Sequence, residues 1–194
     1  MSASPKGKLI VISGPSGVGK SSIIDAVLDR TTSVFSISAT TRQPRPGEVD
    51  GVDYHFVGRQ DFLDAIASHQ VLEWAEYGGN LYGTLREQVE DAIGEGSNVI
   101  LDIENDGAKQ VRQAFGAAIL IFITPPDLDE LEHRLRGRGD TAEADVQKRL
   151  AAASVQIAEA PDVYDFIVEN RGLDAAINHV LDILGLPSAS TRGL

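Results

Sequence analysis

Cysteine is absent from the sequence, which excludes disulfides, thiol nucleophiles and cysteine-ligated metals. Long apolar runs are absent too: the N-terminal stretch Leu9–Ile12 is too short for a signal peptide, and no run approaches the roughly 18 residues of a membrane span. The four histidines, His55, His69, His133 and His179, show no metal-ligand spacing. We therefore expect a cytoplasmic globular protein without a membrane partner.

Positive charge is also scarce, because 17 basic residues stand against 29 acidic ones and the formal net charge is −12. Such a balance argues against a long polyanion, so no nucleic-acid partner is expected. Residues 1–45 nevertheless carry six basic and only two acidic side chains. A locally cationic region in an acidic protein suits a small phosphate ligand.

The most informative stretch is Gly14–Ser21, whose sequence GPSGVGKS has the spacing G-x-x-x-x-G-K-S of a phosphate-binding loop. Residues 8–13 before it favour a buried strand, and residues 22–30 after it favour a helix. Backbone N–H groups and the helix N-terminus would hold phosphates, with Lys20 on the β- and γ-phosphates and Ser21 on Mg²⁺. An incidental glycine-rich turn fits neither the spacing nor the flanks. The expected ATP-binding residues here are Gly14, Pro15, Ser16, Gly17, Val18, Gly19, Lys20 and Ser21.

A stiff loop over residues 40–48 follows a strand-like alternation over 34–39 and contains two prolines and a glycine. Arg42 and Arg45 lie three residues apart on it. Two guanidinium groups on a rigid loop suit a doubly charged phosphate, because each offers a planar set of donors. Two solvated surface charges are the alternative that this segment alone leaves open.

The remaining pattern alternates strands and helices at both ends of the chain, which predicts a parallel α/β sheet with helices on both faces. Residues from about 38 to 97 break this rhythm and indicate an insertion. In it, Thr84 and Glu87 have the spacing of a helix-opening capping box. Strands are expected at 53–57, 71–77, 98–103, 118–123 and 164–170, and helices at 61–67, from 84, at 108–115, from 127, at 143–160 and at 173–184.

Two further segments carry charges that suit phosphate chemistry. Asp102 ends a buried strand, where a carboxylate beside the loop helps to hold the Mg²⁺ shell, although a helix N-cap is a serious alternative. Residues 134–140 hold three arginines and two glycines, which suggests a mobile cationic flap that closes on a transferring phosphoryl group. An ordinary helix C-terminus rich in basic residues is the alternative there.

Several motifs in order resemble the guanylate kinase family: Gly14–Ser21, Ser38–Glu48, Leu72–Ala75 and Tyr82–Thr84. The resemblance runs from about residue 8 to 170 and more weakly to about 184. It implies a P-loop NTPase core over 1–37, 98–133 and 150–194. It also implies an inserted GMP-binding subdomain over 38–97 and a short arginine-rich lid over 134–149.

The resemblance further implies Mg²⁺-dependent transfer of the ATP γ-phosphoryl to GMP, giving ADP and GDP in purine nucleotide metabolism, with dGMP also accepted. The protein would be a monomer or homodimer whose partners are small-molecule substrates. By position, Lys20, Arg42, Arg134, Arg138 and Arg149 would be catalytic, Asn170 would lie near the ATP base, and Ser21 and, through water, Asp102 would hold the metal. The GMP-binding residues would be Ser38, Arg42, Arg45, Tyr54, Glu73, Tyr82, Thr84 and Glu104.

The chemistry of guanine agrees with a carboxylate at residue 73, although that residue taken alone reads as an ordinary strand carboxylate. Guanine presents N1–H and an exocyclic amino group side by side, and a carboxylate accepts from both. Adenine offers no such pair and would leave Glu73 without a partner, a mismatch that discriminates strongly. No side chain has to act as nucleophile, because an oxygen of one phosphate attacks the phosphorus of another.

The sequence departs from the family pattern in three places. Glu104 stands where an aspartate is usual, Asn105-Asp106 replaces a more usual glutamine, and Asp140 is an apparent insertion in the arginine-rich segment. Two other functions remain open: a non-catalytic binding module, and a P-loop kinase for another small phosphate ester. A regulatory GTPase is disfavoured because the sequence has no N-K-x-D motif.

Overall fold

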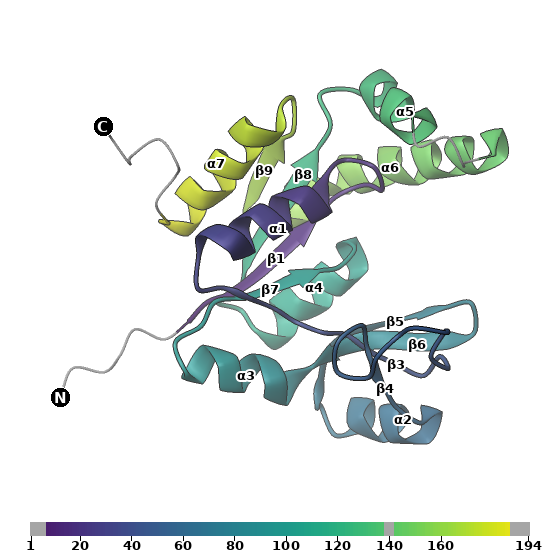
Figure 1. Cartoon of the computed structure of the whole chain (residues 1–194), viewed down its shortest axis with the longest axis vertical. Helices are drawn as coiled ribbons and strands as arrows, with labels where there is room; N and C mark the ends of the chain where they lie inside the picture. The colour runs from purple at the N-terminus through teal and green to yellow at the C-terminus, as the bar shows by residue number, and fades with distance from the viewer. Residues whose placement is uncertain (1–6, 138–141, 187–194) are drawn as a thin grey trace.

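The structure is a computed structural model that describes residues 7–137 and 142–186 (Figure 1). Its larger sheet confirms the expected parallel α/β core. The strand order is β2-β7-β1-β8-β9, and every neighbouring pair is parallel. The strands are β1 (Leu9–Ser13), β2 (Val34–Phe35), β7 (Val99–Asp102), β8 (Ile119–Thr124) and β9 (Phe166–Glu169).

Helices cover both faces of this sheet because the central strands are apolar on both sides. In β1, Ile10 and Ile12 pack under α1 (Lys20–Arg30) and α7 (Leu173–Leu184), while Leu9 and Val11 face the opposite layer. The opposite layer consists of α3 (Arg86–Gly94), α4 (Asn105–Ala114) and the C-terminal part of α6 (Glu143–Val163). Burial on both faces explains why β1 and β8 are continuous runs of apolar residues in the sequence.

The helix α5 (Leu128–Arg136) packs against the N-terminal half of α6 through a small separate cluster that includes Leu131, Leu135 and Val146. Figure 1 shows this pair projecting from one end of the core sheet. Asp127 caps α5, because its carboxylate accepts the Glu130 backbone N–H at 2.7 Å. The expected helix start at residue 127 is thereby confirmed.

A second sheet lies at the other end of the molecule, below the core in Figure 1. Its order is β4-β3-β6-β5, and α2 (Arg59–Ala67) packs on it around Phe62 and Leu81. The strands are β3 (Ala39–Thr40), β4 (His55–Phe56), β5 (Val71–Tyr77) and β6 (Asn80–Leu85). The break in the strand–helix rhythm after residue 38 therefore corresponds to a distinct small sheet.

Two local predictions within this region are wrong. The single strand expected over 34–39 is split, because β2 pairs with β7 in the core while β3 pairs with β4 and β6 in the second sheet. Thr84 does not open a helix: it lies in β6, and α3 begins at Arg86 with no side-chain cap. Its hydroxyl instead donates to Glu73, a tertiary partner that a local pattern cannot reveal.

The described part of the arginine-rich segment ends a helix. Arg134 and Arg136 lie in the last turn of α5, and Gly137 is its C-cap. Arg138 and Asp140 lie outside the described residues, as does the tail from residue 187. Over the described ranges, no helix is both long enough and apolar enough to cross a membrane.

Candidate active site

The carboxyl ends of the parallel strands gather the candidate residues at one edge of the core sheet. The phosphate-binding loop follows β1, Asp102 ends β7, and Asn170 directly follows β9. Ligands of open α/β sheets bind at this edge, in the crevice where the strand order reverses. The topology thus brings together residues that are far apart in the sequence.

The loop itself has a backbone that favours glycine at three points. Gly14 has φ 147°, Gly17 has φ 88°, and Gly19, the N-cap of α1, has φ 99°. A Cβ on Gly14 would lie 2.2 Å from the Ile123 carbonyl oxygen, and one on Gly19 would lie 2.6 Å from the Asn170 amide nitrogen. The loop and the first turn of α1 form the walls of a cavity of about 240 Å³, the phosphate cavity. The backbone N–H groups and dipole of a helix start attract phosphate.

Lys20 lies across this loop. Its Nζ donates to the Gly14 carbonyl oxygen at 2.6 Å and lies 3.9 Å from the Asp102 carboxylate. Although the Asp102 side chain is 33% exposed, desolvation raises its pKa, Lys20 opposes the shift, and Glu104 adds to it. Asp102 does not cap a helix, because the N-cap of α4 is Glu104. The N-cap alternative for Asp102 is therefore wrong.

Three other expected residues surround the loop. Arg134 donates to the Asn170 carbonyl oxygen at 3.0 Å, and the Asn170 side-chain amide donates to the Val18 carbonyl oxygen at 2.8 Å. From α6, the Arg149 Nη1 lies 3.4 Å from the Ser16 hydroxyl. The structure therefore places two of the expected catalytic arginines, 134 and 149, beside the phosphate cavity.

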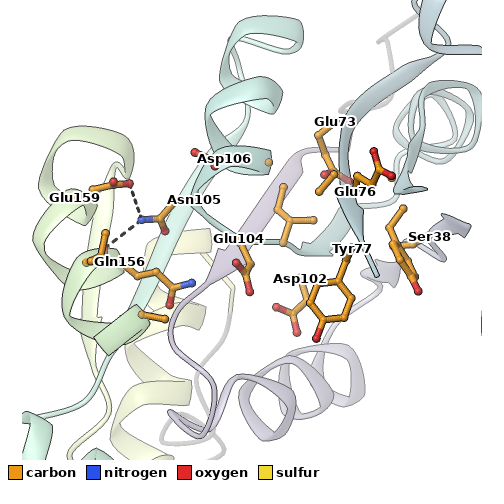
Figure 2. A pocket seen from close by; sticks show the side chains of 17 residues that line it. Ser38, Glu73, Glu76, Tyr77, Asp102, Glu104, Asn105, Asp106, Gln156 and Glu159 are labelled. Atoms are coloured by element: carbon orange, nitrogen blue, oxygen red, sulfur yellow. Dashed lines mark hydrogen bonds between the residues drawn. The ribbon is translucent and has the colours of Figure 1, made fainter. Parts of the chain in front are cut away.

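A larger cavity of about 750 Å³ lies between the core and the second sheet (Figure 2). Its walls come from β5 and β6 on one side, from the end of β7 and the start of α4, and from α6 on the other side. Glu104 lines both this cavity and the phosphate cavity. Four of the expected GMP-binding residues are among its walls: Ser38, Glu73, Tyr82 and Glu104.

Glu73 is the buried carboxylate of this larger cavity, with only 6% of the residue exposed. Its Oε1 accepts the Thr84 hydroxyl at 2.7 Å. Burial raises the pKa of Glu73, and the hydrogen bonds from Thr84 only partly oppose that rise. A buried acceptor of this kind suits a ligand that offers two N–H groups, because the remaining oxygen capacity has to be satisfied.

The stiff loop holds its two arginines through a residue to which the sequence analysis gave no role. The Glu48 carboxylate accepts from both terminal nitrogens of Arg42, at 2.9 Å each, and from the Arg45 backbone N–H at 2.7 Å. Arg42 also lies over the Tyr54 ring, 5.3 Å from its centroid. The charge spacing along the loop could have indicated this ion pair, because Glu48 ends the same rigid segment.

The expected GMP-binding residues thus fall into two groups. Tyr54 packs edge-to-face on Tyr82, with the ring centroids 6.1 Å apart, which links the loop to the larger cavity. Among the described residues, the wall of the larger cavity does not include residues 42, 45, 54 and 84. Thr84 acts on the cavity indirectly, through Glu73.

A metal would meet only oxygen donors here. Ser21, in the first turn of α1, lines the phosphate cavity, and Asp102 lies at the neighbouring strand end. Hydroxyl and carboxylate oxygens are what Mg²⁺ prefers, and Mg²⁺ usually keeps several waters. Among residues 7–137 and 142–186, no three acidic or histidine side chains form a ready-made metal cage. The residues therefore fit a Mg²⁺ that arrives with phosphate ligands.

This combination of a parallel sheet, a glycine-rich loop after its middle strand and a lysine in the cavity at that loop defines a P-loop nucleotide-binding protein. A family model described as "Guanylate kinase" matches residues 6–185. A guanylate kinase of Synechocystis sp. is 48% identical over 183 residues, covering 94% of this chain and 95% of its own. The guanylate kinase of Bacillus subtilis is 46% identical, with 92% and 88% covered.

The crystal structure of guanylate kinase from Anaplasma phagocytophilum superimposes with a TM-score of 0.68 at 30% identity. The match covers 96% of this chain and 89% of that one. The chain belongs to the guanylate kinase family. It is accordingly a kinase of the nucleoside monophosphate class.

Proposed function

We propose that this protein transfers the γ-phosphoryl group of ATP to GMP. An oxygen of the GMP phosphate attacks the γ-phosphorus, the bond from that phosphorus to the β–γ bridging oxygen breaks, and ADP and GDP leave. The observation that carries the proposal is the shared wall of the two cavities at Glu104. Two nucleotides bound there would meet end to end, with their phosphates toward each other.

Each half of the site has residues suited to its nucleotide. The phosphate loop and Lys20 would bind the ATP phosphates, and Arg134 and Arg149 lie beside the loop where negative charge builds up. Glu73 would accept the guanine N1–H and amino group, while Arg42 and Arg45 would hold the GMP phosphate. Mg²⁺, when bound with ATP between Ser21 and the water shell of Asp102, would supply positive charge to the phosphate oxygens.

The remaining assignments belong to the same proposal. Ser38 and Glu104 would assist in recognising the base, and Tyr54 and Tyr82 would contact the GMP phosphate. Arg138 would close over the transferring group as part of a lid over 134–149, with residues 38–97 as the GMP-binding part and the rest as the core. We further propose that dGMP is accepted, that the protein acts in the cytoplasm, and that it works as a monomer or homodimer.

A coupled kinase assay over GMP, dGMP, AMP, UMP and CMP tests the proposal directly. We expect turnover with GMP and dGMP, and at least 100-fold lower kcat/KM with the others, because a buried polar mismatch discriminates strongly. Equal rates with AMP would refute the substrate assignment. The absence of ATP binding in calorimetry would favour a non-catalytic binding module.

Two variants connect the assay to the residues. In Glu73→Gln the preference for GMP over AMP should fall at least tenfold, because an amide offers only one acceptor oxygen to guanine. In Lys20→Met turnover should be nearly abolished while the circular dichroism spectrum stays unchanged. An unaltered preference in the first variant, or near-normal turnover in the second, would contradict the assigned roles.

A further inference from the structure

Helix α4 contacts the larger cavity through its first turns and packs against α6, which lines the same cavity. Glu104 is the N-cap of α4. Gly107 leaves room for Glu73, because a Cβ there would lie 2.9 Å from the Glu73 Oε2. Gln110 accepts from the Trp74 N–H at 3.1 Å and donates to the Trp74 carbonyl oxygen at 3.0 Å. The placement of α4 therefore sets the position of both carboxylates that face the base.

Asn105, the first residue of α4, also lines the larger cavity, and its side chain points toward α6, whose Gln156 and Glu159 line the same cavity (Figure 2). Its Nδ2 donates to the Gln156 carbonyl oxygen at 3.2 Å and to the Glu159 carboxylate at 3.3 Å. Its Oδ1 accepts the Tyr164 hydroxyl at 3.0 Å. Only 6% of Asn105 is exposed. A buried amide that satisfies three partners on one neighbouring element fixes both distance and register.

The partners of Asn105 are themselves held in place. The Tyr164 ring packs on Phe122 of β8, with the centroids 5.1 Å apart, and burial raises the pKa of Tyr164 to about 12, so the hydroxyl keeps its proton and donates. The Lys109 ammonium lies 3.0 Å from Glu159 and, together with Asn105, lowers the pKa of that carboxyl. Glu159 therefore remains an acceptor at neutral pH.

The same helix α6 reaches the phosphate loop at its other half, where Arg149 lies beside Ser16. Asn105 thus joins the helix that carries the base-facing carboxylate Glu104 to the helix that carries a phosphate-facing arginine. A purely structural buried asparagine would stabilise the core without any preference for one substrate. A positioning residue would affect the substrate that α4 faces.

We propose that Asn105 is a positioning residue for the base-binding half of the site, which it sets by fixing the first turn of α4 against α6. This inference rests on the proposed function, since it concerns the binding of GMP. Glu104 and Glu73 would both move away from the base if the hydrogen bonds to α6 were lost. The ATP side would change little, because the phosphate loop is built on β1 and α1.

The test is Asn105→Leu, a nearly isosteric change that removes the three hydrogen bonds. We expect the KM for GMP to rise five- to tenfold, with the KM for ATP and the kcat at saturating GMP within twofold. The affinity for GMP is measured independently by the fluorescence of Trp74, the one tryptophan of the sequence and the neighbour of Glu73. Its dissociation constant should rise by the same factor. An unchanged affinity in the folded variant would overturn the inference.

A second variant separates positioning from stability. In Asn105→Leu/Tyr164→Phe both members of a buried polar pair become apolar, so the melting temperature should recover toward the wild-type value. The affinity for GMP should stay five- to tenfold weaker, because the bonds to Gln156 and Glu159 are still missing. Recovery of GMP affinity together with stability would show a structural role alone. If Asn105→Leu does not fold, the affinity for GMP is measured on this double variant instead.

The control is Gln113→Leu, a similar change at an exposed residue of the same helix that lines neither cavity. It should leave GMP affinity within twofold, because exposed substitutions away from a site have small effects. The wild-type protein is titrated first with GMP and AMP. If the wild-type protein did not bind or phosphorylate GMP, the proposed function would be refuted. If the wild-type protein bound GMP and Asn105→Leu bound it equally well, only the role of Asn105 would be refuted.

Discussion

At the scale of single residues, Glu73 shows a conflict between stability and recognition. The carboxylate is buried against Thr84 and the first turn of α4, where its charged form is poorly solvated. A ligand with two adjacent N–H groups would add hydrogen bonds to this carboxylate. Burial of its charged form costs free energy that such bonds would offset, which is a common property of functional sites.

The consequence for pH is a prediction with a definite sign. The pKa of Glu73 is raised on folding, so the folded state binds the proton more tightly, and stability falls as the pH rises from the unfolded value through the raised one. Glu73→Gln has no such loss. We expect its melting temperature to exceed that of the wild type at pH 8 and the difference to vanish near pH 4. Thermal unfolding followed across this range checks the trend, and a difference that grew toward low pH would contradict it.

Glu48 allows a test in which electrostatics and geometry predict opposite results. Removing a negative charge beside Arg42 should strengthen anion binding if charge alone mattered. The carboxylate, however, orients the guanidinium group and holds the Arg45 N–H, so we expect Glu48→Gln to raise the KM for GMP at least fivefold. Steady-state kinetics with varied GMP concentration measures this KM.

The matched control for this change is Glu90→Gln. Glu90 forms an exposed ion pair with Arg86 on α3, at 3.1 Å, and does not line either cavity. This control should behave as the wild type, because exposed helix pairs contribute little. A lower KM for GMP in Glu48→Gln would show that Glu48 acts only as a charge.

At the scale of elements, the sequence predicted those features whose cause is local. The strand–loop–helix around Gly14–Ser21 follows from glycine spacing and apolar periodicity, and α7 has the bounds predicted. The failures have tertiary causes. The division of residues 34–39 between two sheets depends on their partners, and the Thr84 hydroxyl serves Glu73 instead of a helix end.

The candidate site shows the same division. The loop lysine and the arginines were identifiable from motifs. The structure places Lys20 in the wall of the phosphate cavity and Arg134 and Arg149 beside the loop. The residues that support the site were not identifiable. Nothing in the pattern around Asn105 indicates that its amide meets Tyr164, 59 residues away, because that contact arises only when α4 packs against α6.

The phosphate loop yields a prediction at this scale from a pair of glycines. In Gly14→Ala the new Cβ would collide with the Ile123 carbonyl oxygen of β8, at a backbone φ that alanine rarely adopts. We expect a loss of stability of about 2 kcal/mol or more and an ATP affinity reduced at least tenfold, because the loop must move. Denaturant unfolding and calorimetry with ATP and Mg²⁺ measure these effects.

Gly94→Ala is the matched control. This residue is the last of α3, and a Cβ there meets nothing within 4 Å. Alanine favours the helix by about 1 kcal/mol over glycine, so the control should be as stable as the wild type or slightly more so, with unchanged ATP affinity. Equal behaviour of the two variants would refute the claim that the loop requires glycine at position 14.

At the scale of the whole molecule, two sheets face one cavity, and each side carries part of the chemistry. The residues suited to GMP belong mainly to the second sheet and its loop, whereas the phosphate loop and its arginines belong to the core and α5–α6. Transfer between phosphates requires in-line contact and the exclusion of water that would otherwise hydrolyse ATP. A site divided in this way meets both demands only if its parts approach each other.

We therefore expect the second sheet and the α5–α6 arm to close toward the core when both nucleotides are bound. Small-angle scattering with GMP and a non-hydrolysable ATP analogue should give a smaller radius of gyration than the free protein, with intermediate values for either ligand alone. Full compaction should require both ligands, because their phosphates carry the charge that draws the arginines of the two parts together. A radius that stayed unchanged with both ligands at saturation would mean that the cavity is already closed enough for transfer. In that case water would have to be excluded by the walls of the present cavity, and the divided arrangement of charges would need another explanation.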